Sequence, residues 1–98
     1  MSRPAAVPTV QIDNERIRVT EWRFAPGAAT GFHRHEYDYC VVPLLDGWLG
    51  IESKEGTSES QLAAGRSYFR KAGVAHDVVN INAFEFAFVE VELKEPAA

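Results

Sequence analysis

Cysteine is almost missing from this sequence, because Cys40 is the only one among its 98 residues. A single cysteine excludes any disulfide within the chain, and the absence of a CxxC motif excludes a zinc ribbon. Small secreted domains usually depend on several disulfides. We therefore expect a protein of a reducing compartment, which for this chain means the cytoplasm.

Long apolar runs are also missing. No segment approaches the roughly 20 apolar residues of a membrane-spanning helix, and the opening MSRPAAVPTV holds no apolar core of a secretory signal peptide. We expect no partnership with a membrane.

Positive charge is in short supply. Ten basic residues against fourteen acidic ones give a formal net charge of −4, and the basic residues are scattered along the chain. Proteins that bind phosphate backbones gather Lys and Arg on one surface. We therefore expect no nucleic-acid partner.

What the sequence does contain is enough apolar material for one core. Hydrophobic residues make up 46% and aromatic residues 11% of the chain, which is typical of a globular protein. The length suits one domain over residues 1–98. Pro4 and the alanines beside it predict a loose arm over 1–6, and the EPAA ending predicts a frayed tail over 95–98.

Alternating apolar and polar residues predict short β-strands throughout this domain. Turn signals such as Pro26-Gly27 and Asp46-Gly47 separate them, and no apolar period of 3.6 residues supports a substantial helix. In the last strand, Phe84, Phe86 and Phe88 share one face. We predict an all-β sandwich or barrel of eight or nine strands, including 16–25, 37–45, 48–53, 59–62, 67–70, 76–81 and 85–93.

The three histidines form a candidate metal site. His33 and His35 are separated by one residue, so on an extended segment both imidazoles leave the same face. His76 begins a later predicted strand and, in a closed barrel, could face that pair across the interior. Neutral imidazole binds Fe, Ni, Zn, Mn and Cu. We predict one transition-metal ion per chain, of an identity that the ligand type does not determine.

Two segments resemble the motifs of the cupin family. In Gly27–Gly47, GAATGFHRHEYDYCVVPLLDG, both glycines and the HxH pair stand at the positions of the first cupin motif. In Gly65–Asn80, GRSYFRKAGVAHDVVN, Gly65, Gly73, His76 and Asn80 match the second. The resemblance implies a small single-domain cupin with a conserved barrel: a double-stranded β-helix, or RmlC-like jelly roll. It also implies that His33, His35 and His76 bind the ion.

Two positions depart from the cupin motifs. The proline of the second motif is Lys71, and the glutamate that usually completes the metal site is Cys40. If the strand changes parity after His35, Cys40 enters the cavity as a candidate fourth ligand and would favour zinc or copper. Otherwise Cys40 is a small buried hydrophobe. Tyr39 is the candidate for a catalytic phenol beside the ion.

The resemblance implies a metal-dependent enzyme that acts on a small molecule inside the barrel. Within the family, a three-histidine site without the acid is compatible with dioxygenase chemistry on thiols or diketones. The alternative is a non-catalytic barrel that binds or senses a small ligand. The second face of 85–93 carries Ala87, Val89, Val91 and Leu93, and we predict that such a face is buried in a homodimer.

Overall fold

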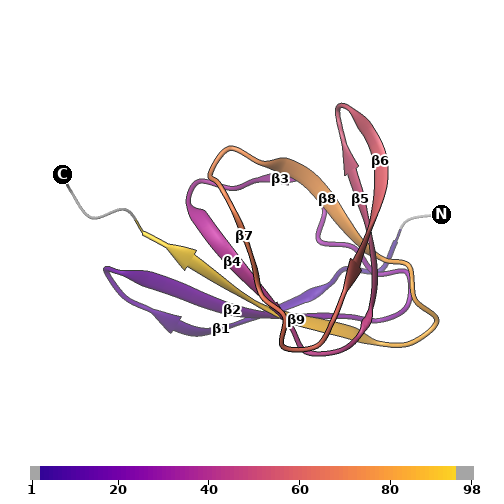
Figure 1. Ribbon diagram of the computed structural model, residues 1–98, viewed down its shortest axis with the longest axis horizontal. Helices are drawn as coiled ribbons and strands as arrows, with labels where there is room; N and C mark the ends of the chain where they lie inside the picture. The colour runs from indigo at the N-terminus through magenta and orange to yellow at the C-terminus, as the bar shows by residue number, and fades with distance from the viewer. Residues whose placement is uncertain (1–2, 95–98) are drawn as a thin grey trace.

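The computed structural model describes residues 3–94, and the tail predicted for 95–98 lies outside this range. Strands form the regular structure of the described chain, as the alternating pattern predicts. None of the described residues forms a helix that is long and apolar enough to span a membrane. In chain order (Figure 1) the strands are β1 (Val7–Asp13), β2 (Ile17–Phe24), β3 (His33–Arg34), β4 (Asp38–Pro43), β5 (Gly47–Ser53), β6 (Gly56–Leu62), β7 (Tyr68–Arg70), β8 (Ala75–Asn80) and β9 (Phe86–Leu93).

Two sheets face each other and make the barrel. One sheet has the order β1-β2-β9-β4-β7 and the other has the order β3-β8-β5-β6. All strand pairs between these elements are antiparallel. Figure 1 shows the β5–β6 hairpin projecting from the rim of the barrel, with β1, β2 and β9 extending together on the opposite side. The all-β, double-stranded β-helix architecture is confirmed.

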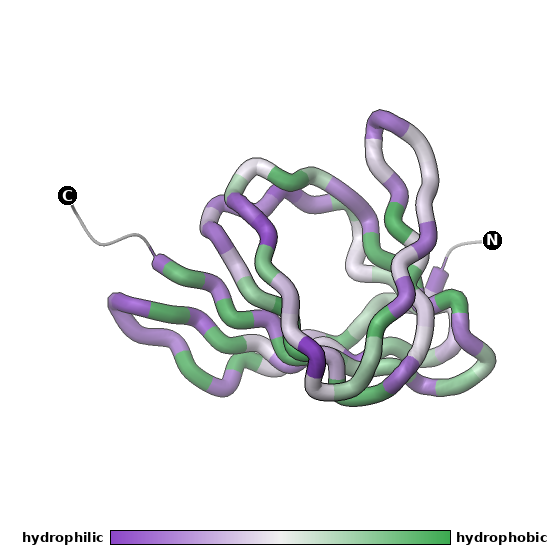
Figure 2. Tube along the Cα trace, viewed as in Figure 1, coloured by the Kyte–Doolittle hydropathy of each residue, from purple (hydrophilic) through white to green (hydrophobic). Residues whose placement is uncertain are grey.

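The core lies between the sheets and is built mainly from alternate residues. Phe86 and Phe88 of β9 point inward and pack with Phe24, Leu49 and Val41, all nearly inaccessible to solvent. Figure 2 shows hydrophobic and hydrophilic residues alternating along β2 and β9, because successive side chains of a strand point to opposite faces. The face predicted for the phenylalanines of the last strand is therefore confirmed at Phe86 and Phe88, and it points inward, whereas Phe84 lies before the strand and is exposed.

Two short stretches differ from the sequence predictions. Strand β1 is not among the predicted strands: all seven of its residues are exposed, so its apolar residues follow no one-sided pattern. The loose arm expected over 1–6 is wrong for its described part. Ala6 donates its N–H to the carbonyl of Ala29 at 2.9 Å, and Ala29 donates to the carbonyl of Pro4 at 2.9 Å. These backbone bonds hold the arm against the barrel.

Asn80 fastens the end of β8 to the loops around it. Its buried side-chain amide donates to the carbonyls of Phe24, Ala25 and Phe84 at 2.9–3.2 Å, and its side-chain oxygen accepts from the backbone N–H of Asn82 at 2.9 Å. This network fixes one end of the strand whose other end carries His76. These contacts give Asn80 a structural role.

Candidate metal centre

Backbone pairing brings the three histidines to one place. His33 lies in β3 directly opposite His76 of β8. His35 follows β3, and its N–H donates to the carbonyl of Val74 at 2.8 Å while its carbonyl accepts from Gly73 at 2.8 Å. These two bonds fix the segment after β3 against the turn before β8. The HxH pair thus reaches His76 through direct hydrogen bonding of neighbouring segments.

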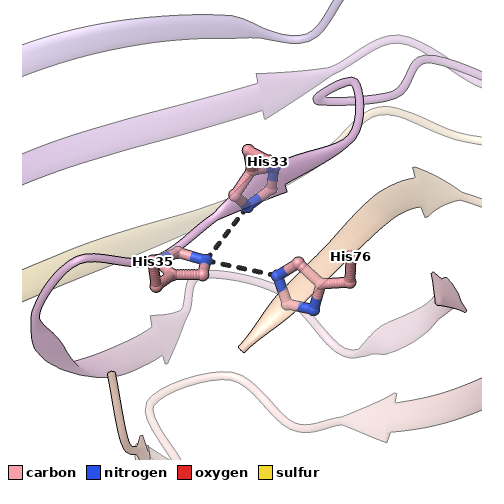
Figure 3. A group of neighbouring side chains, drawn as sticks. All are labelled: His33, His35 and His76. Carbon is pink, nitrogen blue, oxygen red and sulfur yellow. Dashed lines mark hydrogen bonds between the residues drawn. The ribbon is translucent and has the colours of Figure 1, made fainter. Parts of the chain in front are cut away.

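The Nε2 atoms of the histidines converge (Figure 3). Nε2 of His35 lies 3.0 Å from Nε2 of His33 and 3.2 Å from Nε2 of His76. Two imidazole nitrogens bound to one ion at about 2.0–2.1 Å are roughly 3.0–3.4 Å apart at octahedral to tetrahedral angles. The three side chains therefore have the separations of ligands that share one ion.

The protonation of the rings also suits a cation. Nδ1 of His33 lies 2.8 Å from the carbonyl oxygen of Gly31, and because that oxygen only accepts, Nδ1 carries the proton and Nε2 offers a lone pair. Burial, followed by the positive charges of neighbouring rings, lowers the pKa of His35 to about 3. Burial is also the main cause that lowers the pKa of His76 to about 4. Both rings are neutral ligands at pH 7, so the donor set fits a transition-metal ion.

Tyr39 supports the site through its ring. The ring stacks on His35 with centroids 3.9 Å apart and planes 17° from parallel, and the side chain is buried. Burial first, and then the charge of Glu90, raises the pKa of the Tyr39 phenol far above neutral pH. Tyr39 therefore holds His35 in place as a neutral phenol, and its catalytic role remains a prediction.

Cys40 does not lie with the histidines. Strand β4 runs without a register shift from Asp38 to Pro43, and Tyr39 pairs with Glu92 while Cys40 pairs with Val91. Tyr39 lines the cavity, so regular alternation turns Cys40 to the outer face, where it is half-buried. The expectation of Cys40 as a fourth ligand is corrected: the parity change that it required does not occur.

Glu90 of β9 is the site residue that the sequence interpretation missed. Its carboxylate Oε2 lies 3.8 Å from Nδ1 of His35, and both side chains are buried. Burial, followed by the negative charge of Glu92, raises the pKa of Glu90 to about 7. The sequence did carry a signal: in EFAFVEVEL, Glu90 shares the inward parity of Phe86 and Phe88. An acid on an apolar face is expensive to bury unless it has a task or a partner.

A cavity of about 500 Å³ opens beside the histidines. Its inner wall is apolar and includes Trp22, Val41 and Phe88. At its rim the Arg18 guanidinium makes a two-pronged ion pair with Glu92, at 2.8 and 3.2 Å. Space of this size suits a small organic molecule next to the histidine cluster.

Comparisons with known proteins place this geometry among known relatives. No family model matches the chain. The beta-alanine degradation protein BauB of Pseudomonas aeruginosa is 62% identical over 92 residues, which cover 94% of this chain and 97% of that protein. The crystal structure of a cupin domain from Bordetella pertussis superposes with a TM-score of 0.95 at 58% identity, covering 97% of this chain and 99% of that one. A Klebsiella pneumoniae protein with a double-stranded β-helix domain shares the fold at a TM-score of 0.76 and 22% identity, over 100% and 84% of the two chains.

Proposed function

This chain belongs to the cupin family, and we propose from that premise that it is a metal-dependent enzyme whose ion is bound by His33, His35 and His76. The proposal is carried by the position of the His35 Nε2 atom, which lies within hydrogen-bond distance of the Nε2 atoms of both His33 and His76. The ligand atoms of the three histidines all lie within 4.8 Å of one another. Imidazole rings that meet at their nitrogens gain from a cation between them.

The ion and the protein would contribute different parts of the chemistry. A bound transition metal supplies Lewis-acid or redox chemistry, and three protein ligands leave coordination positions open to a substrate and dioxygen. Tyr39 and Glu90 hold the ring of His35 from two sides. The apolar wall beside the histidines excludes water from the small molecule that the cavity takes.

Oxidation by dioxygen is the reaction class that we propose, because the histidine cluster has no carboxylate ligand among the described residues. The experiment has two parts. Metal analysis of untagged protein should give close to one equivalent of Fe, Ni, Zn, Mn or Cu per chain. Oxygen uptake by iron-loaded protein should then rise with one member of a panel of thiols and β-diketones, and it should vanish in His76→Ala.

The name of the Pseudomonas relative extends that panel. That protein is named for the degradation of beta-alanine, and we propose that this chain also acts on a small molecule of that process. β-Alanine and its three-carbon derivatives therefore belong among the compounds tested for oxygen uptake. A compound that stimulates uptake at micromolar protein and saturates would identify the substrate class.

A non-catalytic small-ligand-binding or sensing barrel is the second candidate function. The observation in its favour is that no carboxylate joins the three histidines as a metal ligand among the described residues. Glu90, the nearby acid, lies 3.8 Å from Nδ1 of His35, on the far side of that ring from the other histidines. A sensor would bind a ligand saturably in the metal-loaded state and consume no oxygen. Calorimetric titration of the same panel separates the two functions.

We also propose a cytoplasmic homodimer. Val89 and Val91 of β9 lie beside Val42 and Cys40 of β4 on the outer face of the five-stranded sheet, and Phe69 next to them is 48% exposed. Apolar side chains on an outer sheet face gain from burial against a second copy. Light scattering at micromolar concentration should give twice the 10.9 kDa of one chain, and a value of one chain would refute the dimer.

A further inference from the structure

We propose that Arg70 forms a carboxylate-binding subsite beside the histidine centre, so that the ligand of this barrel is a small anion with a metal-binding group at its other end. The inference rests on the proposed metal function, because it places the far end of the ligand at the ion. Four observations carry it: the register of β7, the absence of an acidic partner among the described residues, the stacking of the guanidinium, and a second cavity that reaches His76.

The register of β7 turns Arg70 toward the interior. Arg70 pairs directly with Tyr39 of the neighbouring strand β4. Residues that face each other in antiparallel strands project from the same side of the sheet. Tyr39 points inward and stacks on His35, so the side chain of Arg70 leaves the sheet on the side of the metal centre.

Arg70 differs from the other arginine on this side of the sheet. Arg18 is neutralised by Glu92 in a two-pronged ion pair. Among residues 3–94, Arg70 is in no ion pair with a carboxylate. Only one of its N–H groups is engaged, with the carbonyl of Phe69 at 3.0 Å. The other donors of this guanidinium are available to a bidentate carboxylate.

Tyr68 orients the guanidinium. The Cζ atom of Arg70 lies 4.6 Å from the centroid of the Tyr68 ring, which is the geometry of a cation–π contact. Stacking fixes the plane of the guanidinium and leaves its edge, with the N–H groups, free. A preoriented fork loses little side-chain entropy when it binds a planar anion.

A second cavity, of about 710 Å³, connects Arg70 with the histidines. We call it the side cavity. Tyr39, Tyr68 and His76 line both the side cavity and the cavity described above. The charged residues around the side cavity are Arg34, Lys54, Glu55, Glu59 and Arg70.

These charges favour an anion close to Arg70. Three of the five charged residues of the side cavity are basic, although the chain as a whole has a net charge of −4. Ser58 and Ser60 add hydroxyl groups that can donate to oxygen atoms. A short carboxylate whose other end carries a thiol, amine or hydroxyl would span the guanidinium and the ion.

The test uses zinc-loaded protein, because zinc has no redox chemistry and binds thiolates strongly. Mercaptoacetate, 3-mercaptopropionate and 4-mercaptobutyrate are titrated calorimetrically against their uncharged amides. We expect the best carboxylate to bind wild type at least about ten-fold tighter than its amide, a difference of about 1.4 kcal/mol. Arg70→Met should remove this preference and keep its zinc, and Arg70→Lys should restore part of it.

Arg66→Met is the matched control. Arg66 is also exposed, and it lines a third cavity that Arg70 reaches as well. Unlike Arg70, Arg66 does not line the side cavity beside His76. Arg66→Met should keep the full preference for the carboxylate. Equal binding of each acid and its amide to wild type, or an unchanged preference in Arg70→Met, would overturn the subsite.

The two proposals fail separately. If wild type takes up no zinc, the metal function fails, and the subsite is then tested on the metal-free protein by titration with acetate. Saturable shifts of the Arg70 side-chain N–H signals in NMR spectra, without shifts of those of Arg66, would support the subsite. Shifts of equal size at both arginines would refute it.

Discussion

Oε2 of Glu90 faces Nδ1 of His35 at 3.8 Å inside the barrel. Glu90 belongs to β9 of one sheet, whereas His35 follows β3 of the other sheet and lies 55 positions earlier in the sequence. A carboxylate behind a ligating imidazole favours the tautomer that keeps the proton on Nδ1 and the lone pair on Nε2. Nε2 of His35 is the atom that lies near both other histidines. We therefore expect Glu90 to favour this tautomer of the central histidine through its charge.

Removal of one histidine should abolish specific metal binding. His76→Ala leaves two of the three converging nitrogens. Loss of a residue that only supports a metal ligand lowers metal affinity about 10–100-fold. Loss of a ligand itself should cost more, so we expect an affinity for zinc at least about 100-fold weaker. Competition with a chromogenic chelator measures this. Cys40→Ser is the control, because Cys40 lies on the outer face of β4. A large loss of affinity in Cys40→Ser would contradict the placement of this residue.

Glu90 should tune the site without being essential to it. Glu90→Gln keeps the size of the side chain and removes the charge behind His35, so we expect zinc affinity to fall about 10-fold. The same chelator competition reports the change. Glu55→Gln, in the exposed turn between β5 and β6, should leave the affinity unaltered. Unchanged affinity in Glu90→Gln would show that Glu90 does not act through His35.

The ionisation of Glu90 should also appear in the stability of the metal-free protein. The pKa is raised from 4.5 to about 7 in the folded state, so the unfolded chain releases this proton at lower pH. The contribution of Glu90 to stability is therefore complete below pH 4.5 and is lost as the pH rises toward 7.

Glu90→Gln stays uncharged and avoids this loss. Relative to wild type, its free energy of unfolding should increase by up to about 3 kcal/mol between pH 4.5 and pH 7. Urea unfolding of the metal-free proteins at several pH values measures the difference. A difference that is constant with pH would mean that Glu90 is ionised in the folded protein as readily as in the unfolded chain.

The Asn80 network should stabilise the fold without taking part in metal binding directly. Asn80→Ala leaves the buried carbonyls of Phe24 and Phe84 without their side-chain donor, and we expect a loss of about 2–4 kcal/mol in the free energy of unfolding. Thermal and urea unfolding give this value. The folded variant should still bind one zinc ion per chain. A loss below 0.5 kcal/mol would show that water replaces these bonds without cost.

Much of the fold was predictable because period-two alternation is a local property. The seven strands for which the sequence analysis gives ranges are all present, with ends that move by up to three residues, as 59–62 becomes Gly56–Leu62. Strand β1 escaped prediction because both of its faces are exposed. A strand at the edge of a sheet buries little and therefore leaves little pattern in its residues.

The sequence by itself determined the all-β class and placed His33 with His35, and Phe86 with Phe88, on one face, because spacing along a strand decides which side chains share a face. The pairing of β3 with β8 then brought His76 to the histidine pair. Only the tertiary structure decided what surrounds those histidines. The uninterrupted register of β4 turned Cys40 outward and Tyr39 inward, and the packing of the sheets brought Glu90 to His35. These outcomes depend on pairing and packing between segments far apart in the chain, which no local pattern encodes.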